Sequence, residues 1–234
     1  MNRRHFNGFW TLTAVFGALF LSPKAYALSL ADLSNAQASQ GLKAALDRGA
    51  RAAVDLLGRP DGFLGDARVR IGLPQALQDA SGLLRTLGQG QRLDELVNAM
   101  NRAAEAAVPL ARDMLVGAVK SMNVQDAKAI LGGGETAVTQ FFVDKTRAPL
   151  GDKFLPVVKK TTTQVNLAEK YNQVAGKAAA VGLLKGEAVT IERYVTGKAL
   201  DGLYFMIGEE EKKIRQDPVG TGSALLKKVF GALQ

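Results

Sequence analysis

Apolar residues recur every three or four positions along most of this 234-residue chain, and strict apolar–polar alternation is nearly absent. In residues 33–57, for example, Leu42, Leu46, Ala53 and Leu56 follow this spacing. Residues spaced in this way fall on one face of an α-helix, whereas a half-buried strand needs alternation. The sequence therefore predicts an all-α fold, a single compact bundle of about eight to nine helices with no significant sheet.

Glycine, proline and capping residues mark the expected helix ends. The stretch GRPDGFLGD, residues 58–66, breaks the first helix, and Phe63 within it is expected to enter the core. The following ARVRIGLP is predicted to be extended, with Ile71 in the core. Asn123 and Thr190 are expected helix caps. The later helices are predicted over residues 135–146, 149–165, 167–180, 190–216 and 223–233.

The N-terminus has the order of a secretory signal peptide. Arg3 and Arg4 precede an apolar run from Trp10 to Leu21, and the small residues of an AYA cleavage signal end at Ala27. The run is too short to span a bilayer stably. We expect cleavage after Ala27, which would leave residues 28–234 as one helical domain in the periplasm. The paired arginines leave the general secretory and twin-arginine routes both open.

Three residue types are missing from the expected mature chain. The only His and the only Trp, His5 and Trp10, lie in the signal segment, and the chain has no Cys. Catalysis by Ser-His-Asp or Cys-His groups is therefore excluded, as are metal sites built on His or Cys. Apolar packing must hold the fold without disulfides. Catalysis would have to use carboxylates, Lys, Arg, Tyr or Ser, or a hard metal with oxygen ligands.

The expected mature chain is moderately basic. Cleavage removes three of the 30 basic residues and none of the 22 acidic ones, which leaves a net charge of +5. Such a charge on an exported protein suits anionic envelope surfaces and indicates no nucleic acid partner. Because basic and acidic residues are interspersed, the charge also fits plain solubility.

The run LDGLYFMIGEEEKKIR, residues 200–215, holds three consecutive carboxylates. On a helix, Glu209 lies opposite the apolar stripe and within reach of Lys213, whereas Glu210 and Glu211 lie about 60° and about 40° from Ile207, beside the stripe. A carboxylate beside a buried seam needs a partner.

We therefore predict a semi-buried ionic cluster of Arg102, Glu105, Glu210 and Glu211. The cluster is either a structural salt-bridge network or a ligand or metal site. No further metal ligands, no catalytic residues and no cofactor are predicted.

Two apolar features have two interpretations each. Phe141, Phe142, Phe154 and Tyr171 form either core or the lining of an apolar pocket for a lipid or acyl chain. The C-terminal helix, residues 223–234, either docks on the bundle or makes peripheral membrane contact.

Several segments together carry a resemblance that spans about residues 35–231. They are SNAQASQGLKAAL, LGRPDGFLGDARVRIGLP, LVNAMNRAAEAAVP, DAKAILGGG, FLPVVKK, KALDGLYFMIGEEEKKIRQDP and LLKKVFG. In that order they resemble the bacterial domain-of-unknown-function family 4197. The resemblance implies a helical, envelope-located protein and assigns no catalytic residue. Gly208 stands where the family pattern has Ala, which is expected to loosen that helix by roughly 0.5–1 kcal/mol.

These observations predict a non-enzymatic binding or interaction module of the cell envelope, with an apolar ligand cavity as one form of the site. Its partner would be an envelope protein or an apolar small molecule. One alternative is a hydrolase that uses Glu105, Glu210 and Glu211 with a divalent metal. Another is a structural partner in an envelope complex, bound through residues 223–234.

Overall fold

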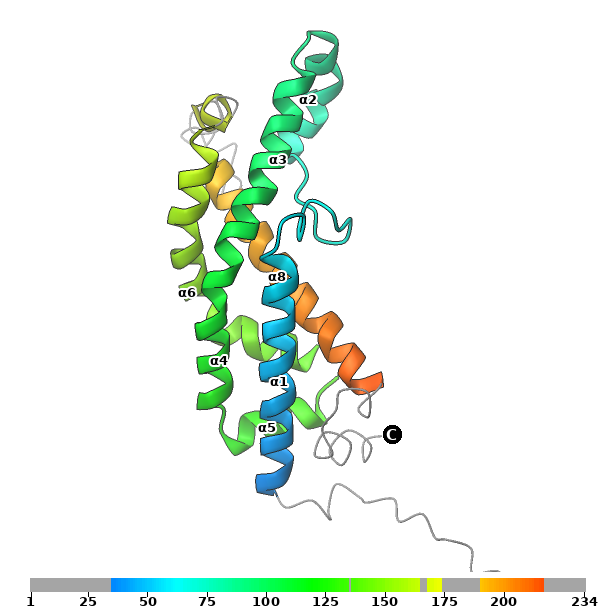
Figure 1. Ribbon diagram of the computed structural model, residues 1–234, viewed down its shortest axis with the longest axis vertical. Coiled ribbons are helices and arrows are strands. Elements are labelled where there is room, and N and C mark those ends of the chain that lie inside the picture. The colour runs from blue at the N-terminus through cyan, green and yellow to red at the C-terminus, as the bar shows by residue number, and fades with distance from the viewer. Residues whose placement is uncertain (1–34, 135, 165–167, 174–189, 217–234) are drawn as a thin grey trace, which may run out of the picture.

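The computed structural model describes residues 35–134, 136–164, 168–173 and 190–216, and within these ranges it contains helices and no strand (Figure 1). The predicted all-α fold is confirmed, with seven α-helices in the described part. The helices are α1 (Asn35–Leu57), α2 (Gln75–Thr86), α3 (Gly90–Ala107), α4 (Arg112–Ser121), α5 (Val124–Gly132), α6 (Ala137–Thr162) and α8 (Ile191–Gln216), with the short 3-10 helix η2 (Val108–Ala111) between α3 and α4.

Helix α8 runs through the middle of the bundle and packs against α6, α1 and α3. The stripe predicted for it is buried, with Leu203 fully enclosed and Tyr204 and Ile207 nearly so. Met206 and Ala199 on its other faces are fully buried as well. A helix covered on several faces must be buried around most of its surface, and between residues 195 and 207 of α8 only Lys198, Asp201 and Phe205 are exposed.

The prediction of separate helices over residues 135–146 and 149–165 is wrong, because α6 is one helix that contains Pro149 and Pro156. Each proline removes a hydrogen bond to the carbonyl four residues earlier. Both prolines are exposed, as are Lys145 and Asp152, whose carbonyls lose that donor, so the freed carbonyls belong to residues on the solvent side of the helix. Figure 1 shows the usual consequence, a bend between the two halves of the helix.

The expected caps are confirmed. Asn123 accepts a hydrogen bond from the Asp126 N–H, and the Asp126 carboxylate accepts one from the Asn123 N–H, which completes a capping box at α5. At α8 the Thr190 hydroxyl accepts the N–H of Arg193 at 3.2 Å. These bonds satisfy backbone donors that a helix start leaves free, so both helices begin where the sequence predicts.

The segment between α1 and α2, residues 58–74, folds back onto the bundle and packs against α3 and α8. Phe63 and Ile71 are buried in the core, as predicted. The Phe63 ring lies against Gly202 of α8, where an added Cβ would come within 2.7 Å of the ring. Gly202 therefore provides the space in α8 that admits the loop.

Gly208 has a packing reason. A Cβ added there would lie 3.1 Å from the Thr139 hydroxyl oxygen of α6. Helices α8 and α6 therefore pack closely at Gly208, and a larger residue there would crowd Thr139.

Several predictions lie outside the described residues. They are the signal peptide, the helix 223–233 and most of the helix 167–180, of which residues 168–173 are described as helical. Within the described part, no helix combines the length and the apolar character needed to cross a membrane.

Candidate functional site

Glu105 of α3 holds the tip of the loop between α1 and α2. One carboxylate oxygen, Oε1, accepts the backbone N–H groups of Phe63 at 3.1 Å and Leu64 at 3.3 Å. The other, Oε2, accepts a hydrogen bond from Arg102 at 2.7 Å. Glu105 is only 5% exposed. Its charge is therefore tied to three donors, which is the condition under which a buried carboxylate is tolerated.

Arg102 extends this contact to the loop surface. Its guanidinium also donates to Asp61 at 2.7 Å, and hydrogen bonds to Glu105 and Asp61 raise the pKa of Arg102. Asp61 has a φ of 61°, in the left-handed region that Asp tolerates better than most residues. Arg102 and Glu105 are thus together, as predicted, and their third charged partner is Asp61.

Asn101 makes the second anchor of the loop, and the sequence analysis missed it. Its side-chain oxygen accepts the Ile71 N–H at 2.9 Å, and its amide nitrogen donates to the Ile71 carbonyl at 2.9 Å and to the Val97 carbonyl at 2.8 Å. Asn101 is fully buried. The signal was the i,i+4 spacing of Asn101 and Glu105, which places two polar groups on one helix face toward a loop with backbone groups to satisfy.

The outer side of this anchored segment forms one wall of a groove. Residues 68–72 face α8 across a hollow of about 380 Å³. The Tyr194 hydroxyl of α8 donates to the Gly72 carbonyl at 3.1 Å and ties the two walls together. Burial raises the pKa of Tyr194, which keeps the hydroxyl a donor.

Three cations and two aromatic rings line the groove. The cations are Arg68, Arg70 and Lys198, and the rings belong to Tyr194 and Phe205. The Arg68 guanidinium carbon lies 6.0 Å from the centroid of the Phe205 ring, within cation–π range.

Two of the three cations lie close to carboxylates, and the third does not form an ion pair with a described residue. Arg68 pairs with Asp66 at 2.6 Å and with Glu209 at 3.6 Å, and Lys198 lies 3.8 Å from Asp201. Arg70 forms no ion pair with any described residue. The charge of Arg70 is therefore the one most available to a ligand.

Arg68 sets the charge state of Asp66 in acid. Its side-chain hydrogen bonds hold the pKa of Asp66 at about 2, below its ordinary 3.8. Because the folded pKa is depressed, the pair stabilises the fold above about pH 4 and loses this contribution as the pH falls toward 2. We expect Arg68→Ala to return the pKa of Asp66 toward 3.8 in an NMR titration of its carboxyl carbon. Arg70→Ala, the matched control, should leave that pKa low, and an unchanged value in Arg68→Ala would contradict the assignment.

Glu209 and Glu210 pair differently from the expectation. Lys213 pairs with Glu210 at 2.6 Å, whereas Glu209 pairs with Lys212 at 3.0 Å and with Arg68. Both ion pairs within α8 join residues three positions apart. The further partner of Glu209 is Arg68 of the loop, which a helical wheel of α8 does not include.

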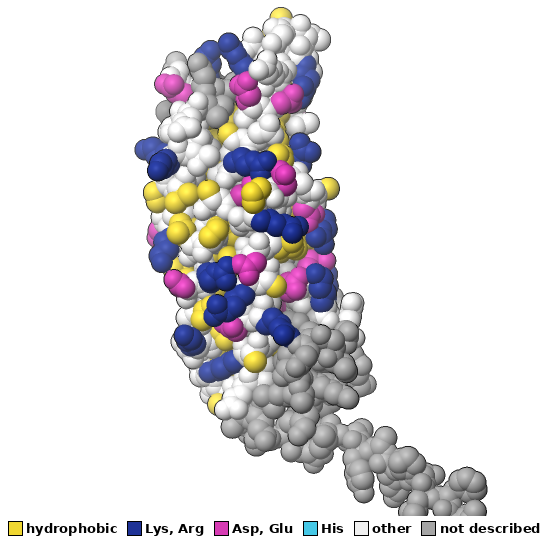
Figure 2. Space-filling model, viewed as in Figure 1, with side chains coloured by type: hydrophobic (Ala, Val, Ile, Leu, Met, Phe, Trp, Pro, Cys, Tyr) yellow, Lys and Arg dark blue, Asp and Glu magenta, His cyan; other side chains and the backbone are white. Residues whose placement is uncertain are grey.

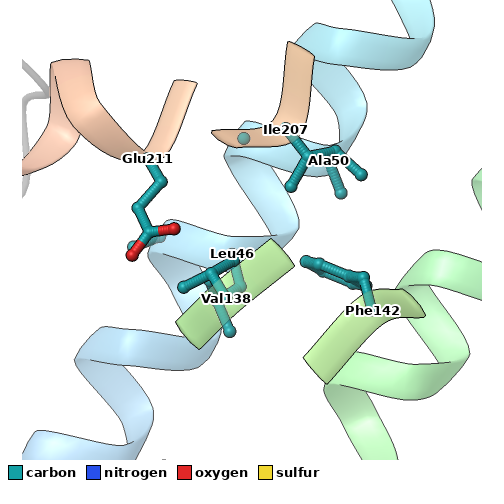
Figure 3. A pocket seen from close by; sticks show the side chains of 8 residues that line it. Leu46, Ala50, Val138, Phe142, Ile207 and Glu211 are labelled. Atoms are coloured by element: carbon teal, nitrogen blue, oxygen red, sulfur yellow. The ribbon is translucent and has the colours of Figure 1, made fainter. Parts of the chain in front are cut away.

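Glu211 lies at a small cavity between α1, α6 and α8, beside Leu46, Val138 and Ile207 (Figure 3). Its side chain is 5% exposed, and the cavity of about 10 Å³ has room for about one water molecule. In the contacts of the described residues, neither Glu210 nor Glu211 joins Arg102 and Glu105.

The four aromatic residues are core residues spread along the bundle. Phe142 and Phe154 are fully buried, and Phe141 and Tyr171 are nearly so. Phe141 and Phe142 form a ring contact, with centroids 5.5 Å apart. Phe154 follows Phe142 by twelve residues on α6, about 18 Å along the axis. The cavity that Phe142 lines is the one of about 10 Å³, which is too small for an acyl chain.

The three carboxylates of the alternative hydrolase can be located in the structure. The described residues contain no group of three or more His, Asp or Glu side chains placed to hold a metal ion. Glu105 uses both oxygens on Arg102 and the loop backbone, and it does not meet Glu210 or Glu211.

Comparison with known proteins adds the family. A family model described as "Protein of unknown function (DUF4197)" matches residues 32–231. No curated protein and no solved structure matches the chain. The match covers the loop, α3 and α8, which together build the anchors and the groove. Because it also extends over most of the sequence, the chain belongs to the DUF4197 family.

Proposed function

We propose that this protein is an exported, non-enzymatic binding module of the cell envelope, and that its binding surface is the groove between residues 68–72 and α8. The signal peptide order at the N-terminus supports export to the periplasm. The lack of His and Cys after residue 27 supports binding rather than catalysis.

The observation that carries the proposal is the way the groove is held. Its loop wall is fixed from beneath by Asn101, which bonds both backbone groups of Ile71, and from the side by Tyr194. Its other wall is the central helix of the bundle. A loop presented on a rigid scaffold loses little conformational entropy on binding, which is the usual arrangement of a binding surface.

The groove chemistry suits an anionic ligand with a flat or apolar part. Three cations and one carboxylate, Asp201, line the hollow. Asp66 and Glu209 pair with Arg68, and Asp201 lies near Lys198, so Arg70 supplies the charge that an anion can use. Arg offers paired donors to a carboxylate or phosphate, and the exposed Phe205 ring offers an apolar surface. Basic and acidic side chains are interspersed over the visible face of the molecule, so a local site is favoured over a broad nucleic-acid surface (Figure 2).

The test is native mass spectrometry of the protein purified from its own periplasm. We expect a discrete small-molecule adduct on the wild type and its loss in the double variant Arg70→Glu/Lys198→Glu. Both side chains are exposed, so the fold should persist, which circular dichroism checks. Lys128→Glu on α5 is a control with the same kind of charge change away from the groove. An adduct retained by the double variant, or a bare protein mass in the wild type, would contradict the proposal.

A further inference from the structure

The groove wall at residues 70–72 is extended chain, with no strand beside it in the described part of the protein. The Asn101 side chain accepts the Ile71 N–H and donates to the Ile71 carbonyl, so both backbone groups of Ile71 point the same way, as in a strand. Arg70 and Gly72 are exposed and Ile71 between them is buried, which is the alternation of a strand. The backbone groups of Gly72 therefore point away from Asn101, and its carbonyl meets the Tyr194 hydroxyl across the groove.

This outward edge has open hydrogen-bonding groups. Among the described residues, neither the Gly72 N–H nor the Arg70 carbonyl has a hydrogen-bond partner. The Gly72 carbonyl accepts one bond, from Tyr194, and a carbonyl oxygen has two lone pairs. The Arg70 N–H donates back to the Asp66 carbonyl at 2.9 Å, so the open edge begins at the Arg70 carbonyl. Exposed backbone edges of this kind are surfaces to which an extended peptide adds as a further strand.

Gly72 leaves room for a second backbone. It does not have a positive φ, and a Cβ added there would meet no atom within 4 Å. Neither the backbone conformation nor the packing of the described bundle therefore requires glycine at this position. Glycine in extended chain often marks a site where another backbone approaches closely. The hollow of about 380 Å³ between this edge and α8 is the space that such a chain would enter.

Arg70 supplies the charge for a bound chain. It forms no ion pair with any described residue. Hydrogen bonding to Arg85 lowers the pKa of Asp94, and the charge of Arg70 adds to this effect. Asp94 is held by Arg85 at 2.6 Å, so it lies in the field of Arg70 without occupying its donors. A carboxylate on the ligand can use those donors.

The register of an added strand brings the open edge and Arg70 together. The ligand residue opposite Arg70 lies two positions from the one opposite Gly72, on the same face. A small anion without a peptide backbone would use Arg70 and leave the Gly72 N–H and the Arg70 carbonyl unmatched. We propose that the ligand of the groove is a short extended peptide, which pairs with the Gly72 backbone as an added strand and sets an Asp or Glu side chain against Arg70. This ligand class rests on the proposed function, which places a ligand in the same groove.

Fragmentation of the adduct in the native mass spectrum identifies the ligand class. The adduct released from the wild-type protein should give a ladder of amino-acid residue masses that includes Asp or Glu. An adduct of any other composition would overturn the peptide and leave the proposed function standing. A bare wild-type protein would overturn both.

Gly72→Val tests the close approach of the two backbones. Isothermal titration with the synthetic form of the sequenced peptide should show binding weakened by about tenfold or more, because the branched side chain crowds the edge. Gly134→Val is the matched control and should bind as the wild type does, since Gly134 is also exposed, lies outside a helix and would place a Cβ in open space. Circular dichroism checks both folds. Unchanged affinity in Gly72→Val would overturn the strand pairing.

N-methylation of the peptide separates strand pairing from a side-chain contact. In either strand direction, the carbonyls of Arg70 and Gly72 accept from two peptide N–H groups two positions apart. Methylation of these two groups should each weaken binding by about tenfold, and methylation of the residue between them should change it little. Arg70→Gln should remove the preference for Asp or Glu over Asn or Gln in the peptide. Equal effects at all methylated positions would overturn strand addition, as would a preference that survives in Arg70→Gln.

Discussion

Replacing Phe63 with alanine is expected to lower the free energy of unfolding by about 3–5 kcal/mol. Phe63 is fully buried although it comes from a loop, and its ring occupies the space that Gly202 leaves in α8. The small residue at 202 cannot fill the resulting cavity, so collapse around it is limited. Urea unfolding followed by far-ultraviolet circular dichroism measures the change, because the fold is helical and the expected mature chain has no Trp.

Phe205→Ala is the matched control. This ring is 41% exposed on the groove side of the same helix that receives Phe63, so its removal should cost less than about 1 kcal/mol. A cost of that size for Phe63→Ala as well would mean that the ring does not hold the loop.

The helical periodicity of the apolar residues predicts the fold, since burial of one face decides both the spacing and the packing. It does not predict that α6 continues through Pro149 and Pro156. That outcome depends on whether the carbonyls freed by proline face water, which is a property of the packed bundle. Considered locally, each proline favours the end of a helix. In the packed bundle α6 continues through both prolines and bends instead.

The charged anchor of the loop was predicted in part, whereas no residue that lines the groove was predicted as a site residue. Arg102 and Glu105 are near neighbours on one helix, so their pairing follows from local geometry. Asp61 completes the charged contact from 41 residues away in the sequence, and Asn101 anchors a segment 30 residues before it. No local pattern specifies such contacts. What the sequence does show is a glycine-rich loop followed by polar residues on an alanine-rich helix.

Glu210 and Glu211 show the limit of the helical wheel. It placed both beside the apolar stripe, and Glu211 is nearly buried there. It could not show that Glu211 lies between α1 and α6 at a cavity that Arg102 does not line, because a wheel carries no information about which helices meet. A cluster drawn from two separate helices therefore required a register that only the fold provides.

Glu105→Ala is expected to lower the free energy of unfolding by about 2–4 kcal/mol, because it leaves two backbone donors at the loop tip without an acceptor. The Phe63 N–H is buried with its residue, so water cannot replace the carboxylate freely. Glu105→Gln keeps an oxygen for these donors and loses the charge, so we expect a smaller cost of about 1–2 kcal/mol. Glu95→Ala on the exposed side of α3 is the control and should change stability by less than about 0.5 kcal/mol.

Arg102→Ala separates the two roles of this carboxylate. The arginine side chain is 44% exposed, so its ion pair with Glu105 should contribute less than about 1 kcal/mol. If the backbone bonds dominate, Arg102→Ala will be mild and Glu105→Ala severe in the same urea measurement. Equal costs for the two variants would instead assign the stability to the ion pair. The first result would make Glu105 an anchor of the loop tip, next to the segment that Asn101 holds beneath the groove. It would also explain why this carboxylate is buried, since its backbone bonds to the loop would outweigh the cost of removing it from water.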